Sequence, residues 1–156
     1  MAFTLTSNIT IGNYTQVKVH GLKIKKSIHK FVDEAVIQVP TLYRLKLNGQ
    51  FVSNSAVKAS DLFQEGDPVA ISLGYNNRNQ TEFIGFIQRV NFKTPLEIEC
   101  EGYSYQLRKK SYLKTWKNTT LVAMLQYLIE GTNITLSPEI PNMPVAKWYM
   151  QNQTGV

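Results

Sequence analysis

The chain has 156 residues, of which 43% are hydrophobic and 18% are charged, a composition that excludes a mainly disordered protein. Seventeen Lys and Arg against eleven Asp and Glu give a formal net charge of +6, which permits an anionic partner without requiring one. A lone cysteine, Cys100, excludes an intramolecular disulfide framework and a cysteine-based zinc site.

The N-terminal segment has neither the basic start nor the long apolar stretch of a signal peptide. No run of about 18 apolar residues occurs anywhere in the sequence, so we expect no membrane segment. The expected place of synthesis is therefore the cytoplasm.

The first part of the chain reads as β-strands. Apolar and polar residues alternate over residues 3–11, 16–28 and 34–39, which is the period of half-buried strands. Gly21 interrupts the second of these segments and indicates a bulge or a bend. The third segment is closed by Pro40.

Residues 41–67 are less regular and are dominated by turn signals. Asn48-Gly49 predicts a turn, residues 53–55 predict a loop, and residues 60–63 predict a single capped turn. A chain reversal is expected over residues 64–67.

Two further strands and a hairpin are predicted next. Residues 68–73 alternate cleanly, residues 74–79 read as a hairpin connection, and residues 81–92 form the longest strand. That strand is apolar on both faces, which indicates burial on both sides or a register shift at Gly85. Residues 96–101 alternate again.

The character of the sequence changes after Gly102. Residues 103–111 are compatible with a short helix or an irregular crossing, and residues 118–120 are expected to cap an amphipathic helix that ends near Gly131. The remaining apolar residues have no obvious partner in the pattern. We predict a β domain over residues 1–102 and the helix-containing, incomplete start of a second domain over residues 103–156. The fold class is mainly β, with a minor α portion near the C-terminus, or α+β overall.

Signatures of catalysis are absent from the sequence. It contains no glycine-rich phosphate loop, no His-Glu-x-x-His motif and no Gly-x-Ser-x-Gly motif. His20 and His29 have no plausible catalytic neighbour in the sequence and read as solvated side chains. We therefore expect no enzymatic activity, no cofactor and no metal.

Three carboxylates, those of Glu97, Glu99 and Glu101, fall on one face of a predicted strand, about 6.8 Å apart. They read as a charged outer face paired with lysines of a neighbouring strand, and the suitable lysines are Lys18, Lys23 and Lys25. A cation site or an acid/base pair is the alternative. Cys100, on the apolar side of that strand, is expected to lie in the core.

Basic residues gather in two clusters, and the second is interleaved with aromatic residues. Its members could bind single-stranded nucleic acid or form a charged rim beside a subunit interface, where Tyr, Trp and Arg are also enriched. The first cluster comprises Lys18, Lys23, Lys25, Lys26 and Lys30. The candidate site residues of the second are Arg108, Lys109, Lys110, Lys114, Trp116 and Lys117.

The segment from Asp61 to Leu128 resembles the phage baseplate hub, or late control protein D, family, whose N-terminal hub module is shared with VgrG spike proteins. The resemblance rests on the order of short motifs over about 70 residues rather than on any one motif. These motifs are Asp61-Leu62-Phe63, Glu65-Gly66-Asp67-Pro68-Val69, Ile71-Ser72-Leu73-Gly74-Tyr75, Glu82-Phe83-Ile84-Gly85-Phe86-Ile87, Ile98-Glu99-Cys100-Glu101-Gly102-Tyr103 with Leu107, and Lys117-Asn118-Thr119-Thr120-Leu121 leading into Leu125.

The resemblance implies a structural protein of a phage tail or a related contractile injection system. It implies an antiparallel, tail-tube-like β-barrel that forms a homotrimeric ring, with the tail tube and spike proteins as partners and a lumen through which DNA could pass. The implied location is the virion tail or injection apparatus, after synthesis in the bacterial cytoplasm. The alternative function is a small nucleic-acid-binding β-barrel protein.

Overall fold

The computed structural model describes residues 4–43, 46–47, 50–51 and 57–153. The chain divides into two compact units, Met1–Gly102 and Tyr103–Val156. The predicted turn at Asn48-Gly49 and the predicted loop at residues 53–55 lie outside the described residues.

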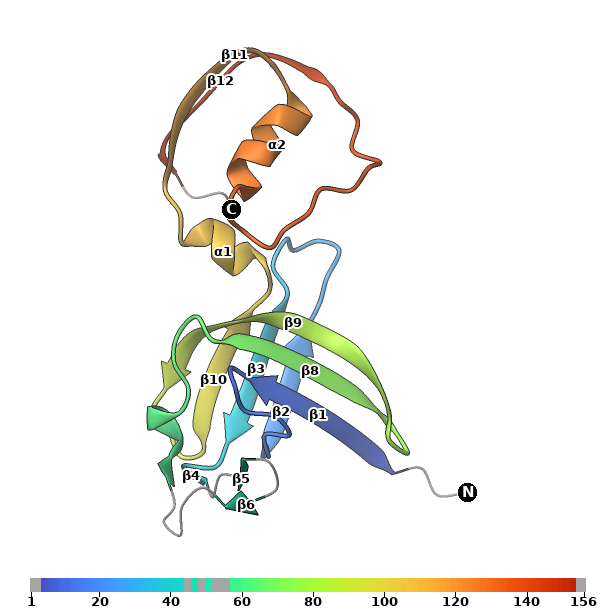
Figure 1. Ribbon diagram of the computed structural model, residues 1–156, viewed down its shortest axis with the longest axis vertical. Coiled ribbons are helices and arrows are strands. Elements are labelled where there is room, and N and C mark those ends of the chain that lie inside the picture. The colour runs from blue at the N-terminus through green and yellow to red at the C-terminus, as the bar shows by residue number, and fades with distance from the viewer. Residues whose placement is uncertain (1–3, 44–45, 48–49, 52–56, 154–156) are drawn as a thin grey trace. The chain divides into compact units, whose positions relative to one another are not determined.

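The first unit is built on one antiparallel sheet of six strands in the order β1-β8-β9-β10-β3-β2, which curves into a half-barrel (Figure 1). The mainly β fold class expected from the sequence is confirmed. The strands of this sheet are β1 (Leu5–Ile11), β2 (Gly21–Lys25), β3 (Glu34–Val39), β8 (Pro68–Tyr75), β9 (Arg78–Asn91) and β10 (Leu96–Glu101). The shorter elements of the unit are β4 (Leu42–Tyr43), β5 (Lys46–Leu47), β6 (Gln50–Phe51), β7 (Val57–Lys58) and a 3-10 turn over Ala59–Asp61.

The core of this unit lies on the concave face of the sheet. Along each strand, every second side chain is apolar and points into this core. Many of these side chains are β-branched, as is typical of strands. Burying each such side chain contributes about 1.5–3 kcal/mol relative to leaving it in water. The fully buried members include Ile9, Ile11, Ile37, Val39, Val69, Ile71, Ile87, Ile98 and Cys100.

Strand β9 keeps one apolar face in this core and leaves the other near solvent. Phe83 and Ile87 are buried, whereas Ile84, on the opposite face, is 50% exposed. The pairing with β10 shifts between Glu99 and Cys100, so that one extra residue of β9 is accommodated there. Strand β9 also has a shift in its pairing with β8, at Glu82. The predicted alternative of a register shift is thus present, but the two shifts lie at Glu82 and beyond Ile87, and not at Gly85.

Gly85 has a different structural requirement. A Cβ atom built at this position would collide with the backbone carbonyl oxygen of Glu101 in the neighbouring strand β10. The residue is therefore a glycine because the two backbones approach closely, which is a common reason for glycine inside a strand.

The hairpin between β8 and β9 is tightly closed. Asn76 and Asn77 both have positive φ, 52° and 63°, as a two-residue type I′ turn requires. The Asn76 side chain accepts a hydrogen bond from the Thr4 backbone at 3.1 Å, and the Thr6 hydroxyl donates to Asn79 at 2.6 Å. These contacts fix the hairpin end to the start of β1.

The second unit comprises α1 (Ser104–Arg108), β11 (Tyr112–Thr120), α2 (Leu121–Ile129) and β12 (Pro144–Gln153). Helix α2 begins as the sequence predicts, because the Thr120 hydroxyl accepts a hydrogen bond from the Ala123 backbone at 3.3 Å. Gly131, just beyond its end, has a φ of +70°. Strands β11 and β12 pair as an antiparallel ribbon that curves around α2 (Figure 1).

Candidate functional site

The candidate residues of the second unit are distributed over α1, the segment that follows it, and β11. Arg108 ends α1, Lys109 and Lys110 follow it, and the others lie on β11. Strand alternation places Lys114 and Trp116 on the face toward α2 and Lys117 on the opposite face. The structure therefore brings two of the candidates together and separates Lys117 from them.

Lys114 is held between aromatic rings of its own unit. Its Nζ lies 3.9 Å from the centroid of the Tyr127 ring of α2 and 5.6 Å from that of Trp116. Trp116 is buried and meets Tyr127 edge to face at 5.4 Å. Such a cation–π contact contributes about 0.5–1 kcal/mol at an exposed site.

Tyr112 adds a second link between β11 and α2. Its hydroxyl donates a hydrogen bond to the Leu128 carbonyl at 2.6 Å, which satisfies a backbone acceptor in the last turn of the helix. Burial raises the pKa of Tyr112, and the nearby Tyr127 raises that pKa further.

Two more lysines of the cluster have partners within the unit. Lys109 Nζ lies 5.1 Å from the centroid of the buried Tyr105 ring, and Lys110 donates a hydrogen bond to the backbone carbonyl of Glu130. Most of the basic and aromatic residues that the sequence groups together thus hold this unit together. They do not form one open surface of alternating cations and rings.

The outward face of the β11–β12 ribbon was not recognised from the sequence. Its members alternate along both strands and line a shallow hollow of about 310 Å³, together with Met150. We call this surface the ribbon face, and it consists of Leu113, Thr115, Lys117, Lys147, Tyr149 and Gln151. The alternation of residues 145–151 is compatible with a strand. The sequence indicated no partner strand for this segment, so no strand was predicted there.

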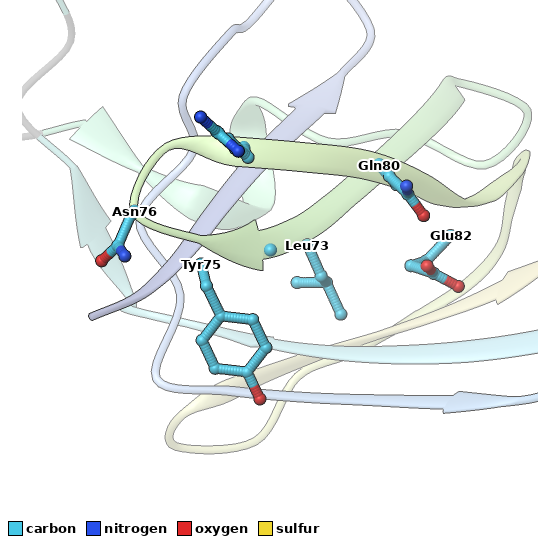
Figure 2. Close-up of a pocket in the computed structure, with 7 residues that line it drawn as sticks. Leu73, Tyr75, Asn76, Gln80 and Glu82 are labelled. Atoms are coloured by element: carbon cyan, nitrogen blue, oxygen red, sulfur yellow. The ribbon is translucent and has the colours of Figure 1, made fainter. Parts of the chain in front are cut away.

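A second hollow lies in the first unit, beside the turn of the β8–β9 hairpin. It measures about 700 Å³ and includes Leu73 and Tyr75, which extend from β8 on the same side (Figure 2). Tyr75 is 55% exposed, and its cross-strand partner Leu5 is 77% exposed. The concave apolar face of the sheet therefore continues past the core into solvent. The remaining lining residues are Gly74, Asn76, Arg78, Gln80 and Glu82.

The carboxylates of β10 have partners, but not the predicted ones. Glu99 accepts from Arg89 at 2.7 Å and from Asn91 at 2.7 Å, and these contacts, the Arg89 hydrogen bond first, lower the pKa of Glu99. Glu97 pairs with Lys93 at 3.3 Å.

For Glu97 and Glu99 the predicted partners Lys18, Lys23 and Lys25 are wrong, because β10 lies between β9 and β3, whereas Lys23 and Lys25 belong to β2 on the far side of β3. Glu101 is buried rather than part of a solvated row. Among the described residues, no group of three His, Cys, Asp or Glu side chains is arranged to hold a metal ion.

Comparison with known proteins gives a likeness of fold. The chain is similar to the 43 kDa tail protein of prophage MuSo2 from Shewanella oneidensis, with a TM-score of 0.65 and 10% sequence identity. The match covers 97% of this chain and 45% of that protein, so the chain spans less than half of its length. No family model and no curated protein matches the sequence. In the part of the chain that the structure describes, no helix has the length and apolar character needed to cross a membrane.

Proposed function

We propose that this chain is a structural, non-catalytic component of a phage tail or a related contractile injection machine. The observation that carries the proposal is the fold likeness to a prophage tail protein over 97% of the chain. The ordered motifs between Asp61 and Leu128 support the same assignment from the sequence. In its finer form, the proposal is a baseplate hub module that forms part of a trimeric ring between tail tube and spike.

An open sheet edge supports assembly through β1. The hydrogen bonds of Gly12 to Pro68 and of Asn76 to Thr4 put the even-numbered residues of β1 in the hydrogen-bonded pairs with β8. The backbone groups of Leu5 and Ser7 therefore face away from β8, at the edge of the described sheet. Such an edge is a template for a strand of another chain.

Exposed apolar side chains lie beside this edge. Leu5 and Tyr75 are each more than half exposed. A neighbouring subunit that paired with β1 would cover Leu5 and Tyr75 on the concave face. In a ring, β1 would pair with a different surface of the neighbouring subunit, which is the heterologous type of contact that can close into a ring.

Electron microscopy of the purified, concentrated protein in negative stain tests the proposal. Ring-shaped particles with threefold symmetry are expected. Particles of monomer size alone, at every concentration imaged, would count against the trimeric ring.

The alternative of a nucleic-acid-binding barrel has less support. Lys109, Lys110 and Lys114 have partners within their own unit, and Trp116 is buried. Stacking of bases requires aromatic faces open to solvent. We therefore favour the structural role over nucleic-acid binding.

A further inference from the structure

Two lysines face each other on the ribbon face. Lys117 of β11 and Lys147 of β12 are direct cross-strand partners, and both are exposed. Side chains in such positions lie about 4.5–5.5 Å apart at Cβ, and like charges placed there destabilise the pair. The outward face of the ribbon therefore carries, at one end, two lysines whose positive charges repel each other.

The surrounding unit does little to neutralise these charges. Neither lysine takes part in an ion pair among the described residues. Within residues 103–153 the acidic side chains are Glu130 and Glu139, both outside the ribbon. The basic side chains are Arg108, Lys109, Lys110, Lys114, Lys117 and Lys147.

Away from the lysines, the ribbon face exposes two large apolar side chains beside Thr115 and Gln151. Leu113 is 70% exposed and Tyr149 is 69% exposed, and both line the hollow with the two lysines. A ligand that fits this surface needs a carboxylate for the ammonium groups and an apolar side chain for the remainder. A carboxylate placed between two ammonium groups forms charge-assisted hydrogen bonds to both.

This chemistry favours a protein segment over a nucleic acid. The face offers one aromatic ring, that of Tyr149, and its other large apolar side chain, Leu113, is aliphatic and provides no stacking platform. Two cations neutralise few phosphates, whereas a nucleic-acid-binding surface usually carries a longer row of basic side chains.

We propose that the ribbon face binds an acidic segment of another protein. A Glu or Asp of the segment lies between Lys117 and Lys147, and an apolar side chain of the segment packs on Leu113 and Tyr149. This surface is distinct from the edge of β1 and does not rest on the phage-tail assignment.

Fluorescence anisotropy with a labelled peptide of about eight residues, in which Glu alternates with Leu and Thr, tests binding at about 50 mM salt. We expect measurable binding that weakens about tenfold when Gln replaces Glu in the peptide. Lys117→Gln and Lys147→Gln should each weaken binding several-fold. Lys25→Gln, which removes the same charge from an exposed position on β2, should leave it unchanged.

Thermal melting of the same variants supplies a second readout. Lys147→Glu should abolish peptide binding and yet raise Tm by about 2–4 °C, because it replaces a repulsive pair with an attractive one. A merely disruptive substitution would lower both. The gain should shrink at high salt.

Three results would overturn the proposal. The first is no peptide binding by the folded protein, and the second is equal binding of the Glu and Gln peptides. The third is binding of an oligo-dT of about 20 nucleotides that is lost in Lys117→Gln, without peptide binding, which would assign the face to nucleic acid. None of these results bears on whether the protein forms rings.

Discussion

Arg89 donates two hydrogen bonds to one carboxylate oxygen of Glu99, at 3.1 Å from Nε and 2.7 Å from a terminal nitrogen. The pair joins β9 to β10 on the outer face of the sheet, directly beside the register shift between Glu99 and Cys100. The contact helps to hold the two strands together where their regular pairing is interrupted.

The Arg89–Glu99 pair makes stability depend on pH. Because the pKa of Glu99 is lower in the folded protein than its ordinary value of 4.5, its stabilising contribution is present above pH 4.5. That contribution is lost as the pH falls through the folded pKa. We expect Glu99→Gln to be less stable than the wild type at pH 7, with a smaller fall in stability on acidification. Urea denaturation at a series of pH values measures this.

Arg89→Gln is the matched variant for that experiment. It should reproduce the loss at pH 7, and the double variant should lose little more than either single variant, since both remove the same contact. Full additivity of the two effects would show that the pair does not act as a unit.

Two lysines on the same strand should differ in their effect on stability. Lys114→Ala removes the contact with Tyr127 and should destabilise the second unit by about 0.5–1 kcal/mol. Lys117→Ala removes one member of a like-charge pair and should be neutral or slightly stabilising. Thermal melts of the two variants, followed by circular dichroism, test the difference, and an equal loss in both would contradict it.

Assembly through β1 should be sensitive to a proline at one position of the strand. Ser7→Pro removes a backbone donor that faces the open edge, so the fold should persist while higher-order species disappear. Ser7→Ala should assemble like the wild type. Thr6→Pro, which removes a bond to β8, should instead lower the stability of the fold. Loss of assembly in Ser7→Ala as well would argue against a backbone contact.

Cys100 should be unreactive in the folded protein. Burial raises the pKa of its thiol to about 12, so little thiolate exists at neutral pH, and the side chain is 2% exposed. A thiol reagent at pH 8 should label it only after denaturation. Rapid labelling of the native protein would show that the core around β10 opens.

The sequence predicts the main strands of the first unit well because polar and apolar residues alternate clearly along them. Alternation over residues 68–73 and 96–101 specifies which side chains are buried, and the structure buries Val69, Ile71 and Ile98 as that pattern requires. The predicted lysine partners of Glu97 and Glu99 were wrong because alternation within a strand does not indicate which strands are neighbours in the sheet. Ion pairing across strands depends on strand order, which is set by the whole sheet.

The second unit shows a different limit. Strand β11 combines Lys, Thr and Asn with aromatic residues, and its partner β12 lies beyond both α2 and a long loop. Local pattern does not reveal such pairing, so Trp116 and Lys117 appeared as one cluster. Alternation along β11 places these two residues on opposite faces, and the pairing of β11 with β12 shows that Lys117 faces Lys147.

The mass of the native particle tests the proposed structural role most directly. Size-exclusion chromatography with light scattering should give a species of three times 17.8 kDa that Ser7→Pro converts to monomer. A strictly monomeric wild-type protein at the highest concentration reached, with the fold intact by circular dichroism, would contradict a ring built from this chain.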